Sequence, residues 1–164
     1  IHLSIRRQRQ MCIRDRIDIM SFTLHPFLVH FPIAFIFGAF ILHTIHLIKS
    51  NWIHKTTGLW LVGLSAIFSI FSSITGEWEL KKATEKNYST EVTNLMNQHE
   101  IFGNVVTWGS IIFFIFWMYL FYNYKDDRRI DIIAFAFLFL LVCAVFFTAY
   151  LGGTLVWSHG VGRH

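Results

Sequence analysis

The sequence predicts an all-α integral membrane protein, a bundle of four transmembrane helices. Apolar residues make up 54% of its 164 residues and charged residues only 15%, too few charges to cover a soluble domain of this size. Four apolar runs contain no Asp, Glu, Lys or Arg, and each is long enough to cross a bilayer. Because a spanning segment must satisfy its own backbone hydrogen bonds in hydrocarbon, we expect all four to be helices.

The predicted spans form two hairpins that run up, down, up and down. They cover about residues 31–48, 56–75, 101–124 and 132–158. The tight, charged loops 49–55 and 125–131 close the two hairpins. The connection 76–100 between the second and third spans is longer and polar, and we expect a loop or a short helix there, outside the membrane. An even number of crossings places both termini on the same side as this connection.

Residues 1–19 are set apart from the membrane domain, which we assign to residues 20–164. They carry five Arg and two Asp, and they lack the continuous apolar core of a signal peptide. We interpret them as a non-native or disordered leader, with Met20 as the native start. A short basic tail is the alternative.

Lysine and arginine predict the orientation and the location. The tight loops hold five of these residues, whereas the opposite side holds four, spread over longer segments. The positive-inside rule therefore predicts an inner-membrane protein with cytoplasmic tight loops, and with both termini and residues 76–100 outside. From Met20 onward nine basic residues face eight acidic ones, so no basic patch predicts nucleic-acid binding.

Three histidines, His30, His99 and His159, stand at the same predicted end of three different spans. Imidazoles near the membrane need partners and indicate a functional site. We expect these three to meet in one outward-facing pocket. Gly103 and Gly152 lie on the same helical faces as His99 and His159, where they would leave space for a flat ring.

Three interpretations of such a pocket remain open. Haem b needs two neutral imidazoles on facing helices and an apolar wall, which would make the chain an electron-transfer subunit. A zinc or copper ion could be held by the three imidazoles, with His25, Glu77 and Glu100 as supporting groups around it. In the third interpretation no cofactor binds, and the histidines hydrogen-bond within the bundle of a structural scaffold subunit.

The sequence does not favour an independent enzyme, because it contains no recognisable nucleophile–base pair or phosphate-binding loop. A proton pathway is also disfavoured, since no span carries an acidic residue at mid-membrane depth. The expected partners are the lipid bilayer and either a redox partner protein or a second copy of the chain.

Two end motifs, HPFLVHFPIAF (25–35) and GGTLVWSHGVG (152–162), resemble a bacterial membrane family called domain of unknown function 2231. The family pattern opens with HP-x-x-VHFPIA and closes with GG-x-LVY-x-HG-V-G; Trp157 stands where Tyr is usual. The resemblance covers Met20 to His164 and implies a multi-pass prokaryotic protein, without implying a reaction. A link of some relatives to cytochrome-like components favours haem. The residues that match the family motifs are His25, His30, Gly152, Gly153, His159 and Gly160.

Overall fold

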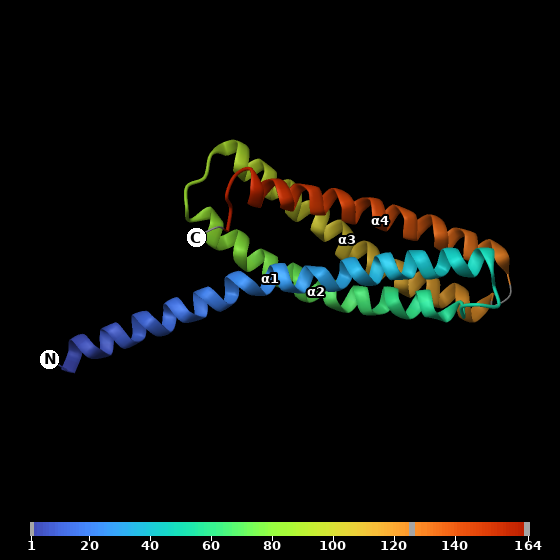
Figure 1. Cartoon of the computed structure of the whole chain (residues 1–164), viewed down its shortest axis with the longest axis horizontal. Coiled ribbons are helices and arrows are strands. Elements are labelled where there is room, and N and C mark those ends of the chain that lie inside the picture. The colour runs from blue at the N-terminus through green and yellow to red at the C-terminus, as the bar shows by residue number, and fades with distance from the viewer. Residues whose placement is uncertain (1, 125–126, 163–164) are drawn as a thin grey trace.

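The structure, a computed structural model, describes the backbone of residues 2–124 and 127–162 and, within these ranges, the side chains from Leu24 onward. It consists of helices α1 (His2–Ile48), α2 (Thr56–Thr84), α3 (Thr90–Asn123) and α4 (Arg128–Trp157) (Figure 1). These ranges contain no strand, so the predicted all-α fold is confirmed. The leader assigned to residues 1–19 lies outside the described side chains and stays a prediction.

The helices form a ring in which each one packs against two neighbours. Helix α1 packs against α2 and α4, and α3 packs against the same two helices. The pairs α1/α3 and α2/α4 lie diagonally across the bundle and make no close backbone contact in the described residues. The chain is therefore an up-down-up-down bundle of the hairpins α1–α2 and α3–α4. We call the end with the two short inter-helix turns the tight-loop end (Figure 1).

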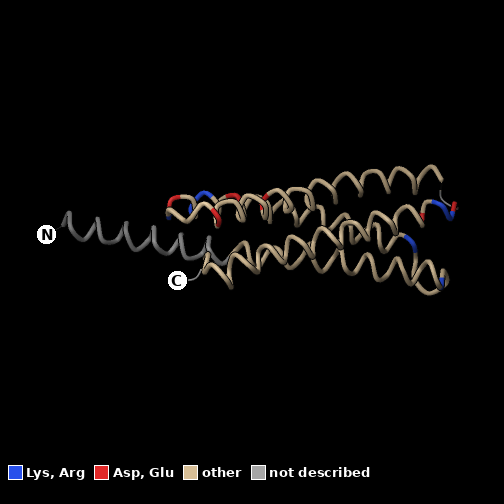
Figure 2. The backbone as a smooth tube through the Cα atoms, turned by 90° about the horizontal axis from the view of Figure 1, so that it is seen from above, with Lys and Arg blue, Asp and Glu red and all other residues tan. Residues whose placement is uncertain are grey.

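Each helix contains an apolar stretch long enough to cross a membrane. The candidate spans are Leu24–Ile48, Thr56–Thr84, Thr90–Asn123 and Arg128–Trp157. Large apolar side chains cover the outside of the bundle; Phe146, for example, is 61% exposed. Figure 2 shows the charged residues at the two ends and an uncharged stretch between them. A bundle with this distribution of side chains has sides that suit lipid.

The interior is filled by one face of each helix. Ile36, Val62 and Leu138 have no exposed surface, and they join a single apolar cluster with residues of α3. Small residues of α2 let α3 approach closely. A Cβ atom on Gly63 would stand 2.7 Å from Cε2 of Phe114, so only glycine fits beside that ring. Close helix contacts at small residues are typical of membrane bundles.

A small polar layer crosses the core between α2 and α3. The hydroxyl oxygens of Ser69 and Ser110 are 3.3 Å apart, and the Thr107 hydroxyl donates to the Ser69 carbonyl at 3.4 Å. Ser65 donates to the Pro32 carbonyl of α1 at 3.3 Å. Ser65 and Ser69 of α2 and Thr107 and Ser110 of α3 recur at helical spacing, and all four are buried.

On α1 the small residues Ala34 and Gly38, which follow His30 at one-turn spacing, do not form the buried face. His30 and Ala34, on one helical face, are both exposed. Among the described side chains of α1, from Leu24 onward, the buried ones are Pro32, Ile36, Ala39 and His43. They recur every three or four residues and bring larger side chains into the core, which a stripe of small residues alone would leave poorly filled.

Between the second and third spans the structure has longer helices in place of a separate loop or short helix. The polar residues after Thr75 continue α2 to Thr84, supported by a Lys81–Glu77 contact of 2.7 Å one turn apart. The turn includes Asn87, whose φ of 51° is left-handed. Ser89 then caps α3, where its hydroxyl accepts the Val92 N–H.

Candidate functional site

His25 extends from α1 to the backbone of α2. Its Nδ1 lies 2.9 Å from the Ser72 carbonyl oxygen and 3.3 Å from the Thr75 hydroxyl. Because a carbonyl only accepts, Nδ1 carries the proton and donates it. A Cβ atom on Gly76 would stand 2.8 Å from Cε1 of His25. The half-buried ring therefore lies flush against α2 only because residue 76 is glycine.

His99 makes the same arrangement between α3 and α4. Its Nδ1 lies 3.1 Å from the Thr148 carbonyl oxygen, so here too Nδ1–H is the donor. A Cβ atom on Gly152 would stand 2.9 Å from Cε1 of His99. The predicted space beside Gly152 is thus taken by the imidazole of His99 itself.

The two hairpins therefore repeat one design. In each, the first helix sends an imidazole to a carbonyl of the second helix, and a glycine that admits the ring follows four residues later. His25 and His99 come from the diagonal helices α1 and α3, and they are close enough to interact electrostatically. We call the end of the bundle that holds this pair the histidine end.

The hydrogen bonds determine what each ring can offer to a ligand. In a neutral imidazole whose Nδ1 carries the proton, Nε2 has a free lone pair. No side chain or backbone group in the described part of the chain bonds to Nε2 of His25 or His99, and neither atom is fully enclosed. A carbonyl-bound Nδ1 with an available Nε2 is the usual state of a metal-binding histidine.

The other two predicted ligands lie elsewhere. His30 is exposed, and its Nδ1 donates to the Pro26 carbonyl of its own helix. His159 follows α4 and lines a cavity of about 320 Å³ with residues of α3, among them Glu91 and Gln98. The predicted trio is therefore not brought together. The described side chains include no group of three or more His, Cys, Asp or Glu that could hold a metal ion.

The turn that carries His159 explains one glycine of the closing motif. Gly160 has a left-handed φ of 66°, which a residue with a side chain rarely adopts. This turn lets the Val161 N–H donate to the Leu155 carbonyl at 3.0 Å, six residues back, and so closes the C-terminal end of α4. Val161 then packs on a small apolar cluster that contains Leu155.

The remaining predicted site residues differ in their surroundings. A Cβ atom on Gly103 would meet no atom within 4 Å, so open space lies one helical turn from His99. Glu77 is exposed and pairs with Lys81, and Glu100 is exposed as well. Neither carboxylate takes part in the His25–His99 arrangement.

Two histidines, His25 and His43, make inter-helix hydrogen bonds that the sequence does not predict. The sequence predicts His25 as a supporting group, whereas in the structure it provides one of the two inter-helix imidazoles. His43 is only 1% exposed; its Nε2 donates to the Asp131 carbonyl at 2.8 Å, and its enclosed Nδ1 has no partner in the described structure. His25 and His43 are eighteen residues apart, or five helical turns, so the sequence places both on the same face of the helix.

Comparison with known proteins places the chain in a family whose function is unknown. A family model described as "Predicted membrane protein (DUF2231)" matches residues 21–164. No curated protein and no solved structure matches the chain.

Proposed function

The chain belongs to the DUF2231 family of predicted membrane proteins, and from that premise we propose that it is an electron-transfer subunit that binds haem b through His25 and His99. One observation carries the proposal: two imidazoles from diagonal helices are each fixed by an Nδ1–H bond to a neighbouring helix, and each has an available Nε2. His99 is a ligand that the sequence predicts. His25 takes the place of His30, which faces outward.

The chemistry of these residues fits haem b. Haem b would be held by the neutral imidazoles of His25 and His99, and the carbonyls of Ser72 and Thr148 hold both rings in the tautomer that leaves Nε2 available to it. The open space at Gly103 and the apolar rings of Phe102 and Phe147, whose centroids are 4.5 Å apart, suit the edge of a macrocycle. When bound, haem b supplies one-electron chemistry, which an adjacent redox protein or a second copy of the chain could use.

A zinc or copper ion is a weaker candidate. Zinc sites usually have three or four protein ligands, and the described side chains include no group of three His, Cys, Asp or Glu that could provide them. Glu77 and Glu100, which could have completed such a site, are exposed.

A structural role is the second candidate, and the same hydrogen bonds favour it. His25 joins α1 to α2, and His99 joins α3 to α4. Inter-helix side-chain hydrogen bonds in membranes contribute about 0.6 kcal/mol on average. In a scaffold subunit the two histidines would serve only to join the helices, and the protein would bind no haem and be colourless.

Absorption spectroscopy separates the two candidates. The full chain is purified in mild detergent, and a dithionite-reduced minus oxidised spectrum is recorded together with the iron content, before and after addition of haemin. We expect the difference spectrum of a six-coordinate b-type haem. His25→Ala and His99→Ala should each abolish it. The matched control His30→Ala removes an exposed imidazole from the same helix as His25 and should leave the spectrum intact.

Two results would reject haem binding at this pair. One is wild-type protein with no Soret change and no stoichiometric iron after exposure to haemin. The other is a normal spectrum in both His25→Ala and His99→Ala. A colourless protein whose melting temperature falls in these two variants would instead support the structural role.

A further inference from the structure

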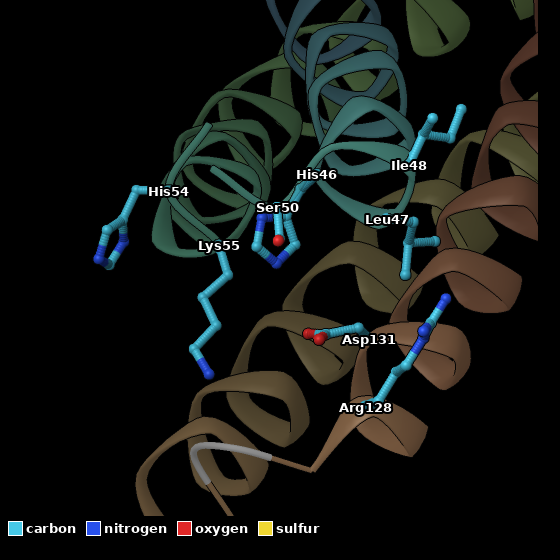
Figure 3. Close-up of a pocket in the computed structure, with 8 residues that line it drawn as sticks. All are labelled: His46, Leu47, Ile48, Ser50, His54, Lys55, Arg128 and Asp131. Atoms are coloured by element: carbon cyan, nitrogen blue, oxygen red, sulfur yellow. The ribbon is translucent and has the colours of Figure 1, made fainter. Parts of the chain in front are cut away.

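A second cavity opens at the tight-loop end, away from His25 and His99. Its volume is about 540 Å³, and Figure 3 shows the side chains around it. They come from the end of α1, the loop that follows it and the first turn of α4. The lining residues are His46, Leu47, Ile48, Ser50, His54, Lys55, Arg128 and Asp131.

Two opposite charges on the first turn of α4 line this cavity without pairing. Arg128 makes no hydrogen bond or salt bridge with a described residue, and neither does the carboxylate of Asp131. The Asp131 contact with His43 uses the backbone carbonyl. In Figure 3 the carboxylate points toward the Lys55 side of the cavity, whereas the guanidinium of Arg128 extends toward Leu47 and Ile48. The cavity therefore presents the Arg128 guanidinium and the Asp131 carboxylate apart from each other, with Lys55 as a second cation in its lining.

The position of the cavity matches the headgroup level of a bilayer. Ile48 is the last residue of α1 and Arg128 the first of α4, so the apolar spans end here. Trp52, in the loop that follows α1, is 72% exposed, as a membrane-interface anchor would be. Leu47 and Ile48 offer apolar surface at the side of the cavity, where acyl chains could lie.

We propose that this cavity binds the headgroup of a phospholipid that carries a primary ammonium, such as phosphatidylethanolamine. The phosphate would bind the guanidinium of Arg128, whose fork of N–H donors suits phosphate oxygens. The ammonium would donate to the carboxylate of Asp131. A choline headgroup has no N–H to donate, and a glycerol headgroup has no cation. The site is separate from the haem proposal and goes beyond it.

Native mass spectrometry of the delipidated full chain tests the proposal, with phosphatidylethanolamine, phosphatidylcholine and phosphatidylglycerol of equal acyl composition added in turn. We expect preferential retention of phosphatidylethanolamine. Arg128→Gln and Asp131→Asn should each weaken it about tenfold, the effect of losing one charge-assisted hydrogen bond. Asp131→Glu should restore most of the binding. Arg129→Gln is the matched control, because this exposed neighbour does not line the cavity.

Free phosphoethanolamine and inorganic phosphate form a further arm that distinguishes a lipid from a soluble ligand. Equal retention of the ethanolamine and choline lipids would overturn the proposal, and so would loss of binding in Arg129→Gln equal to that in Arg128→Gln. Binding of free phosphoethanolamine as tight as that of the lipid would overturn the lipid assignment. Melting curves confirm that the variants fold, and the haem spectrum, measured in parallel, reports on the histidine end independently.

Discussion

The imidazole of His99 lies so close to Gly152 that a Cβ atom on residue 152 would stand 2.9 Å from the ring carbon Cε1. Gly152→Ala must therefore displace the ring and weaken its bond to the Thr148 carbonyl. We expect the substitution to lower the free energy of unfolding by about 1–3 kcal/mol, as overpacking does, and to weaken any haem binding. Thermal unfolding in detergent measures the first effect, and haemin titration measures the second.

Gly153→Ala is the matched control for this prediction. A Cβ atom on Gly153 would meet nothing within 4 Å, and alanine is favoured over glycine in a helix by roughly 0.5–1 kcal/mol. The control should be neutral or stabilising. If the two variants lose the same stability, the contact between His99 and Gly152 is not the cause.

A double-mutant cycle between His25 and His99 tests whether the two hairpins serve one ligand. If both imidazoles hold one haem, removal of either should eliminate most of the haem affinity, so the double variant should bind hardly more weakly than either single variant. In protein without haem, the two inter-helix bonds belong to different hairpins, and their losses in stability should add. Additive losses in haem affinity would contradict a shared ligand.

The tight-loop end should depend on His43 for stability. Its ring is 1% exposed and packs edge-on against Trp117 with centroids 5.0 Å apart. We expect His43→Ala to cost about 2–4 kcal/mol, since it leaves a cavity and removes a buried hydrogen bond. His54→Ala, in the exposed loop, should change stability by less than about 0.5 kcal/mol. A normal haem spectrum in His43→Ala would show that His43 stabilises the fold without contributing to haem binding.

Much of the architecture followed from the sequence, because long charge-free runs have few alternatives to spanning helices. The four spans, the two hairpins and the inward direction of His99 could all be predicted. The extension of α2 to Thr84 could not be read from hydropathy, since polar residues beyond an apolar run form either a helix or a loop. There, local pairs such as Glu77–Lys81 favour the helix.

The candidate site was harder to predict because it depends on the rotation of α1 about its axis. Small residues mark the face with His30 and Ala34, whereas bulky residues mark the face with Ile36 and His43. Only packing against α2 and α4 decides between these faces. The His25 ring lies against Gly76 because α1 is rotated in this way. No short stretch of the sequence specifies that rotation.

Glu77 and Glu100 provide a test of whether acidic residues support the cofactor. Both are exposed, and Glu77 already pairs with Lys81, in a contact whose partners are 56% and 70% exposed. Exposed pairs of this kind contribute little, so Glu77→Gln and Glu100→Gln should leave the melting temperature and the haem spectrum nearly unchanged. A lost spectrum in either variant would show that an acidic side chain supports the haem site, contrary to this expectation.

The contact between Ser69 and Ser110 joins α2 to α3 in the core, yet it should contribute little. Each hydroxyl has one proton, and each already has a backbone acceptor, Ala66 at 3.0 Å and Thr107 at 2.9 Å. At most one proton is shared across the 3.3 Å between the two oxygens. We expect a coupling energy of at most about 0.6 kcal/mol in a Ser69→Ala, Ser110→Ala cycle measured by unfolding in detergent. A larger coupling would mean that the inter-helix bond prevails over the backbone bonds, and that this layer fixes the register of the two helices.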